Sequence, residues 1–365
     1  MKNLIRTCGI GLLAFMGILS SCSDEDYQSP DDLSVNSSVV HKEVPDFVAT
    51  LSPQQRENLE KTGEIFLPEQ RKDSWNDIIA EDVPTRWGVF NSPFKTQTRA
   101  AGIWGSYPAQ YWTMIRLKTA TLDSRLRDAI NAAVDEIETN TNVRFYNSQN
   151  DPKYYEPGHI EYPNVYICYS DGNNEGSGSF GLVGGEQQIR VPAEFADRNL
   201  YTDEEVVGFL MHALCNAAGM FNEQQRKDRD SYVDIYLNNV KSGCTFQFAK
   251  QDKNYTMLGN FDYNSITLAS SQAYSKNGYN TITKKGGGLI ARNYHLSALD
   301  KSFLNNFYLP YIARTDLWIK LDKVVFYNDR ILTESERLQL QRQMNEQRGL
   351  YGEPPASGDI QRQPW

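Results

Sequence analysis

The stretch that decides the fold runs His212-Ala213-Leu214-Cys215-Asn216-Ala217-Ala218-Gly219-Met220-Phe221-Asn222-Glu223 in a chain of 365 residues. Apolar residues at helical spacing lead into it from Asp203 and stop at Gly219. Glycine adopts the left-handed conformation that commonly ends a helix. The stretch is therefore predicted to be the end of a helix followed by a tight turn, with His212 and Asn216 on the same helical face.

The segments around this helix predict an α+β layer structure. Thr202 can serve as the N-cap of the helix. An earlier amphipathic helix, capped by Thr121 or Asp123, is predicted to end before Asn140. Alternating apolar residues then predict short strands separated by glycine-rich turns. These strands cover residues 143–146, 165–169 and 188–191.

The composition favours a folded protein that does not bind nucleic acid. Hydrophobic residues make up 40% of the chain, which is enough apolar area to offset the entropy of ordering it. The formal net charge is -9, whereas binding to a phosphate backbone requires clustered Lys and Arg. Cys168, Cys215 and Cys244 fit neither a metal-ligand spacing nor a disulfide framework, so buried free thiols are expected.

The first residues have the layout of a secretory signal. A positive start precedes the apolar run 9–19, which is too short to span a membrane. Leu19-Ser20-Ser21-Cys22 resembles a bacterial lipobox, in which the cysteine is acylated. The acidic run Ser23-Asp24-Glu25-Asp26 resembles the signal by which Bacteroides-type bacteria export lipoproteins to the cell surface. We expect residues 1–21 to be a signal peptide and Cys22 to carry the lipid anchor of a surface-exposed outer membrane lipoprotein.

The stretch from His212 to Glu223 resembles the zinc signature H-E-x-x-H-x-x-G-x-x-H-E of the metzincins, and residues 224–240 narrow the resemblance to the astacin family. Further segments resemble astacin landmarks in the same order, so the resemblance covers residues 98–308. These segments are 141–145, 181–187, 261–265, 273–278 and 296–300. The resemblance implies a zincin-like two-lobed domain with a twisted mixed sheet, an active-site helix and a mostly irregular lower lobe.

Most of the residues that give the family its chemistry are absent. In active members three histidines bind zinc and a glutamate takes a proton from the bound water. Here only His212 remains, because Asn216 and Asn222 stand at the other ligand positions and Ala213 stands at the position of the glutamate. Ala269 replaces the tyrosine of the Met-turn S-x-M-H-Y, whose methionine is also absent. The resemblance thus implies a degenerate site, and neither a catalytic residue nor a bound cofactor is expected.

Other parts of the family pattern are retained, and they imply structural roles. Glu223 matches the glutamate that meets the new N-terminus of matured astacins. The residues expected to shape and brace the turn are Gly219, Glu223, Arg226, Asp228, Arg229 and Asp230. A two-ligand metal clip of His212 and Cys215, joined by Glu223, is an alternative. A buried histidine beside a buried thiol is the simpler interpretation.

The regions that flank the domain have less pattern. Residues 22–97 are interpreted as a tether and pro-segment-like region with one short helix at 53–61, and Arg99-Ala100 resembles a maturation site. Residues 309–365 are predicted to form a C-terminal extension with a strand-like segment and an amphipathic helix. These two elements cover Leu317 to Tyr327 and Glu334 to Gln347. The strand is expected to complete the main sheet, and the tail after Gly349 is expected to be loose.

Three functions are compatible with these observations. The first is a proteolytically inactive surface lipoprotein that binds a polypeptide or another surface protein. The second is a structural partner of other outer membrane lipoproteins, with the C-terminal extension as its contact. The third is an active zinc metalloendopeptidase with atypical ligands. The substitutions at Ala213, Asn216 and Asn222 favour the first.

Overall fold

A computed structural model of the chain describes its domain and C-terminal extension. The described residues are 103–104, 114–151, 154–155, 160–161, 164–170, 181, 186–250, 255–256, 260–327, 330–346 and 348–365. The predictions for the signal peptide, Cys22, the tether, the helix at 53–61 and the Arg99-Ala100 bond lie outside them. Within the described residues, no helix is long and apolar enough to cross a membrane.

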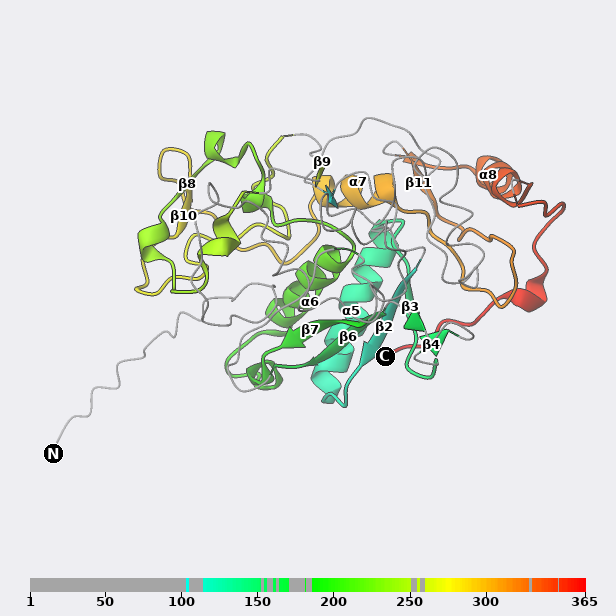
Figure 1. Cartoon of the computed structure of the whole chain (residues 1–365), viewed down its shortest axis with the longest axis horizontal. Helices are drawn as coiled ribbons and strands as arrows, with labels where there is room; N and C mark the ends of the chain where they lie inside the picture. The colour runs from blue at the N-terminus through cyan, green and yellow to red at the C-terminus, as the bar shows by residue number, and fades with distance from the viewer. Residues whose placement is uncertain are drawn as a thin grey trace, which may run out of the picture.

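The part of the protein built around the principal core, from Ile115 to Met220, is called the upper lobe here. A four-stranded sheet, drawn in the lower half of Figure 1, forms its base. Its strands, in spatial order, are β3 (Phe145–Asn147), β2 (Ile115–Thr119), β6 (Asn164–Tyr169) and β7 (Glu186–Val191). All three strand pairs are parallel, so the mixed sheet expected from the sequence is not seen among the described residues. Parallel pairing is possible because each connection between successive strands is long enough to bring the chain back to the end of the sheet where the previous strand began.

Two helices, α5 (Ser124–Asn140) and α6 (Asp203–Ala217), lie beside each other over this sheet (Figure 1). Asp123, not Thr121, caps α5 by accepting a 3.0 Å hydrogen bond from the Leu126 amide. Thr202 and Glu205 form a capping box at the start of α6, as the sequence predicts for Thr202. The apolar faces of the helices and the sheet form the principal core of the protein.

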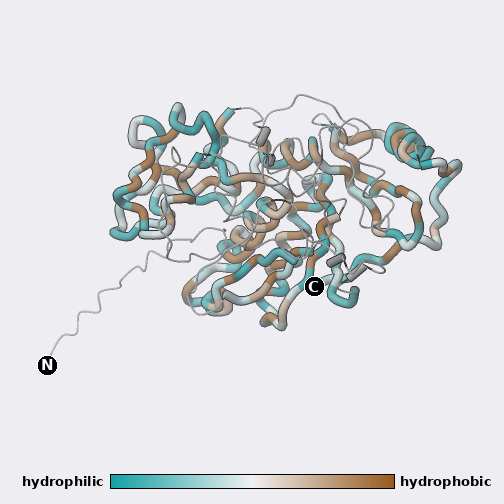
Figure 2. The backbone as a smooth tube through the Cα atoms, viewed as in Figure 1, coloured by the Kyte–Doolittle hydropathy of each residue, from teal (hydrophilic) through white to brown (hydrophobic). Residues whose placement is uncertain are grey.

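The lower lobe has a second, smaller core and few regular elements. Its longest sheet is the antiparallel pair of β8 (Val233–Ile235) and β10 (Ile282–Lys284). Between them the described residues form loops, two short 3-10 helices (Leu237–Asn239 and Thr245–Phe248) and the strand β9 (Tyr255–Thr256), which pairs with β1 (Ile103–Trp104). Figure 2 shows hydrophobic residues along the central strands and helices and mostly hydrophilic residues on the outer loops. The two-lobed zincin-like architecture with an irregular lower lobe is therefore confirmed.

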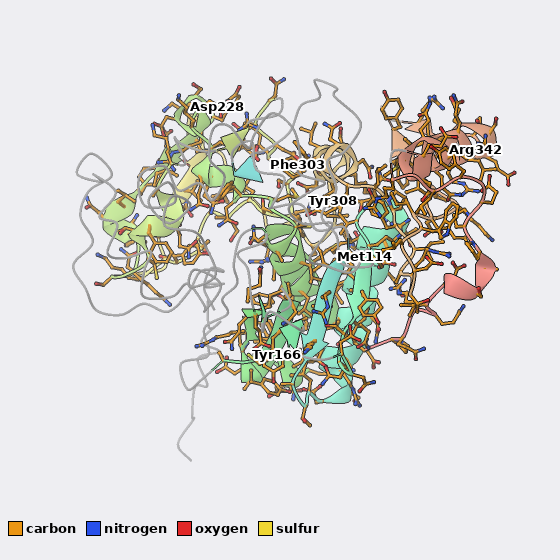
Figure 3. The ribbon with its side chains drawn as sticks, turned by 45° about the vertical axis from the view of Figure 1, so that its right-hand side comes forward. Met114, Tyr166, Asp228, Phe303, Tyr308 and Arg342 are labelled. Atoms are coloured by element: carbon orange, nitrogen blue, oxygen red, sulfur yellow. The ribbon has the colours of Figure 1, made fainter. Side chains whose placement is uncertain are left out.

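Helix α7 (Ala298–Phe307) leads out of the lower lobe and back to the principal core. Ser297 and Asp300 form a capping box at its start. The Tyr308 hydroxyl, just beyond its end, donates a 2.8 Å hydrogen bond to the Ala218 carbonyl. This bond fixes the end of α7 against the end of α6, and Figure 3 shows Phe303 and Tyr308 beside the helix pair.

The C-terminal extension forms a third core with residues of its own and with Met114 from the start of the upper lobe (Figure 3). Its elements are β11 (Phe326–Tyr327), β12 (Arg330–Ile331), α8 (Glu334–Glu346) and a 3-10 turn, η10 (Ala356–Gly358). The prediction of α8 is confirmed to within one residue.

The predicted strand from Leu317 to Tyr327 is largely wrong, and so is its predicted place in the main sheet. Only β11 is a strand, and it pairs with β12 in a two-stranded hairpin. Upstream, side chains of α8 bind the backbone that a neighbouring strand would otherwise bind. Asn345 accepts from the Ile319 amide at 2.8 Å, and Gln341 accepts from the Leu321 amide at 2.9 Å. The segment's backbone also pairs with Tyr311, but only through an isolated antiparallel bridge at Leu321. An alternating pattern therefore marks burial here without a regular strand.

The tail is docked against the upper lobe, which corrects the expectation that it is loose. The indole N–H of Trp365 donates to the Leu117 carbonyl at 3.1 Å, and the Asn147 side chain donates to the Pro364 carbonyl at 2.7 Å. Arg362 forms an ion pair with the half-buried Glu138 of α5 at 2.5 Å. These contacts join positions more than 200 residues apart, so no local pattern could reveal them.

Candidate active site

The end of α6 is shaped by a Schellman turn, a hydrogen-bonded helix ending that requires a left-handed residue. Gly219 has φ of 97° and takes that position. Its amide donates to the Asn216 carbonyl at 2.8 Å, and the Met220 amide donates to the Cys215 carbonyl at 3.0 Å. The turn reverses the chain and brings Asn222 back toward the helix, so Gly219 has the position that the sequence predicts.

His212, Asn216 and Asn222 come together in a buried cluster at this turn. The Nε2 atom of His212 lies 2.9 Å from Oδ1 of Asn222. The Asn216 amide nitrogen donates to the Met220 carbonyl at 2.7 Å and to Oδ1 of Asn222 at 3.3 Å. Because amide oxygens only accept, the imidazole must donate from Nε2 and is held as that tautomer.

The imidazole of His212 is neutral at physiological pH. Burial and the nearby positive charge of Arg292 lower its pKa to about 3, against smaller opposing effects of the hydrogen bonds to Asn222 and Asn216. A neutral ring can bind a metal through an unprotonated nitrogen. The nitrogen that faces the other two family ligand positions is, however, already bonded to an amide.

The positions of the general base and of the Met-turn tyrosine carry methyl groups. Ala213 is fully buried in the principal core. The amide of Ala269 donates to Oε1 of Gln224 at 3.0 Å, so this segment is fixed by its backbone. Thr267, where the methionine is expected, donates through its hydroxyl to the Phe221 carbonyl at 3.1 Å. Neither position offers a group that could move a proton or stabilise an oxyanion.

Glu223 is buried next to the cluster and binds the lower lobe. Its Oε1 atom accepts from the Asp262 amide at 2.7 Å and from the Arg226 guanidinium at 3.3 Å. Among the described residues its Oε2 atom has no hydrogen-bond partner. Burial raises the pKa of Glu223 to about 8, although Arg226 lowers it. Protonation of Oε2 is thus favoured while Oε1 keeps its two donors.

Four charged residues brace the chain after this point, away from α6. Arg226 forms a two-pronged pair with Asp228 at 2.9 Å for both bonds, and Figure 3 shows Asp228 on the lower lobe. Arg229 binds Asp230 at 2.6 Å and also donates to the Phe248 carbonyl. Such forked guanidinium bonds fix loops geometrically. None of these four residues contacts the His212 cluster in the interactions described for it.

Asp300 holds the Met-turn segment in place, a role that no sequence pattern indicates. Its carboxylate accepts from the Ser265 hydroxyl at 2.7 Å, from the Ile266 amide at 2.8 Å and from the Ser297 amide at 3.0 Å. Burial raises its pKa to about 6. The capping-box spacing of Ser297 and Asp300 is visible in the sequence, but its second function depends on the fold.

The donor set does not fit a catalytic zinc ion. Such sites use three firm protein ligands plus water, whereas this cluster offers one imidazole and two neutral amides. Cys215 does not supply the missing ligand, because burial raises the pKa of its thiol well above the usual range. Within the described part of the chain, no group of three His, Cys, Asp or Glu side chains could hold a metal ion.

Together, the parallel sheet, the helix ending in a glycine turn, and the loop packed beneath it define a zincin-like domain of the zinc-peptidase class. Residues 100–309 match the peptidase family Astacin, and the chain belongs to this family. The family assignment made from the motifs is therefore confirmed.

Several relatives share this domain. Zinc metalloproteinase nas-15 of Caenorhabditis elegans is 31% identical over 188 residues, which are 50% of this chain and 29% of that protein. Zinc metalloproteinase nas-4 of the same organism is 30% identical over 51% of this chain and 54% of its own length. The chain thus spans about half or less of these two relatives. Astacin-like peptidase p16 of Argiope aurantia is 42% identical over 73 residues, 20% of this chain and 71% of its own.

A solved structure also aligns with this chain. High choriolytic enzyme 1, a hatching enzyme zinc-protease from Oryzias latipes, aligns with a TM-score of 0.43 and 23% identity. The alignment covers 56% of this chain and 92% of that one.

Proposed function

We propose that this astacin-family domain is proteolytically inactive and acts as a module that binds a polypeptide or a partner protein. The observation that carries the proposal is the 2.9 Å hydrogen bond between His212 and Asn222. The side chains at two positions whose histidines bind one ion in active members bind each other here instead.

The missing groups reinforce one another. Metal, base and transition-state stabiliser act as one unit in such hydrolysis. Once several of these groups are lost, those that remain contribute little to catalysis. A general base alone contributes about 10²–10⁴-fold. With Ala213 buried in the core and Ala269 in the Met-turn, even a metal forced into the site would lack both partners.

Retention of the two-lobed frame supports a binding role. Each lobe keeps a hydrophobic core of its own, so the frame that would present a binding surface does not depend on a metal ion. We further propose that the domain is presented at the cell surface by a lipid on Cys22, the interpretation that the N-terminal sequence favours.

Metal analysis combined with a restoration variant tests the inactivity. The purified wild type is expected to contain no stoichiometric zinc and to cleave no peptide. The variant A213E/N216H/N222H rebuilds the three ligands and the base, and is expected to bind zinc. Zinc in the wild type, with hydrolysis that a chelator abolishes, would refute inactivity and favour the active-enzyme alternative.

The binding role needs a separate measurement. Fluorescently labelled casein and gelatin should bind saturably and remain intact by gel electrophoresis. A domain that binds neither these polypeptides nor any protein captured from its own outer membrane would refute this part of the proposal while leaving the inactivity standing.

A further inference from the structure

A second site lies on the upper lobe, where the docked tail meets the ends of two strands. Strands β2 and β3 are parallel, so Thr119 and Asn147 end them at the same edge of the sheet. The tail residues Gln363 to Trp365 lie across this edge and form a groove of about 440 Å³ with the loops that follow the strands. Cavities of about 300–1,000 Å³ are the usual size of small-ligand sites.

The groove depends on the C-terminal extension and therefore is not a general feature of the family domain. The family match ends at residue 309, whereas one wall of the groove is Trp365. The Trp365 backbone exchanges two hydrogen bonds of 3.2 Å with the Asn131 side chain of α5, and its indole N–H binds the Leu117 carbonyl. The half-buried ring is thus held in one orientation, which lowers the entropy lost when a ligand binds.

The groove presents many neutral polar groups. Gln149 uses its side-chain oxygen to accept from the Thr119 amide at 3.0 Å, which leaves its NH₂ group for other partners. Asn150 and Gln363 are exposed, and their side chains have no partner among the described residues. Of the described lining residues none has an acidic side chain, and Arg127 is the one cation.

This combination of groups selects a class of ligand. A metal ion or an ammonium group would need carboxylates, and a polyanion would need several cations. An indole wall with amides and hydroxyls around it matches a sugar ring, which has an apolar C–H face and a rim of hydroxyls that both donate and accept. We propose that this groove binds a neutral saccharide, with its ring against Trp365 and its hydroxyls on Asn150 and Gln363. This site shares no residue with the His212 cluster, so it stands or falls independently of the proposed function.

Binding can be measured by isothermal titration of the full-length mature protein. The probes are linear neutral oligosaccharides of hexose or N-acetylhexosamine units, with uronic acid oligomers as the charged comparison. The variant N150A/Q363A removes two exposed amides that make no side-chain hydrogen bond among the described residues. Q339A removes an exposed amide from α8 and serves as the matched control.

The expected result is saturable binding of at least one neutral oligosaccharide. N150A/Q363A should weaken it about tenfold or more, because hydroxyls of the ligand lose their partners, and Q339A should leave it unchanged. Absence of binding by every neutral probe, binding confined to uronic acid oligomers, or equal affinity of N150A/Q363A and wild type would each overturn the proposal.

Discussion

Replacement of His212 by glutamine should change the acid stability of the protein by a predictable amount. An exposed histidine in the unfolded chain has a pKa of about 6.5, whereas that of the folded His212 is about 3. Between these values the unfolded chain binds a proton that the native protein does not. The free energy of unfolding therefore falls as the pH is lowered from about 7 toward 3, and wild-type stability from this group is fully present above pH 7.

The magnitude follows from the same two pKa values. A pH of 5 lies about 1.5 below the pKa of the unfolded histidine, which corresponds to about 2 kcal/mol of stabilisation of the unfolded state. The native state gains almost nothing, because pH 5 is still well above a pKa of about 3. Glutamine does not titrate, so H212Q lacks this loss of about 2 kcal/mol.

Urea unfolding of wild type and H212Q at pH 8 and pH 5 isolates the effect. H212Q should be less stable than wild type at pH 8, since Gln cannot reproduce the ring's packing, and the deficit should shrink by about 2 kcal/mol at pH 5. Other titrating groups are common to both proteins and cancel. An unchanged deficit would show that His212 takes up a proton in the native state, and the buried neutral imidazole on which the site's interpretation rests would be refuted.

Three further changes test other parts of the structure. E223Q should gain stability relative to wild type by on the order of 4 kcal/mol between pH 5 and pH 9 in guanidinium unfolding. The reason is that the native Glu223 carboxyl keeps its proton up to about pH 8, whereas a glutamate with the ordinary pKa of 4.5 has lost it. Wild-type stability therefore declines as the pH rises through this interval. Parallel pH profiles of stability for E223Q and wild type would contradict the prediction. Gly208→Ala should lower the free energy of unfolding by about 1–3 kcal/mol, and with it the melting temperature, because the new Cβ would lie 2.6 Å from Cδ1 of Tyr294. A rise in melting temperature, the usual result of Gly→Ala in a helix, would contradict the close packing at Gly208. Asn142→Ala should cost about 2–3 kcal/mol and speed hydrogen exchange in the extension, because Asn142 binds both the amide and the carbonyl of Phe326 at 2.9 and 2.8 Å; unchanged exchange would show that the extension is held elsewhere.

Local chemistry made the central helix predictable. Thr202 and Gly219 are start and stop signals that act through hydrogen bonds to residues within a few positions, and both occupy the positions predicted for them. The same holds for α5 and α8, whose apolar spacing and caps are local features. The spacing of Asn216 and Asn222 around Gly219 also follows from the motif, so their meeting with His212 could be expected from the sequence.

Features that depend on distant partners could not be predicted. The segment around Ile319 and Leu321 alternates like a strand, yet the amides of these two residues bond to side chains of α8, and the backbone pairs only through the isolated bridge between Leu321 and Tyr311. Trp365 forms a hydrogen bond with Leu117, which lies 248 positions earlier in the sequence. Burial of Asp300 beneath the Met-turn likewise has no signature beyond its capping box. Pattern indicates which groups must be satisfied, whereas only the fold determines what satisfies them.

The frame of the site survives because its supports do not pass through a metal. The Schellman turn at Gly219 is held by backbone hydrogen bonds, and Asp300 holds the Met-turn segment by accepting a hydrogen bond from the Ile266 amide. Glu223 joins the turn to the lower lobe by accepting a hydrogen bond from the Asp262 amide. In an active zinc site the ion adds its own cross-links, and their removal leaves ligands that must find new partners or remain desolvated without them. Asn222 and Asn216 solve most of that problem, since their amides bind His212, each other and the Met220 carbonyl, although Oδ1 of Asn216 has no hydrogen-bond partner among the described residues. Asparagine at the two ligand positions thus fills the space beside His212 with hydrogen bonds, so the two-lobed frame does not depend on a metal ion for its support.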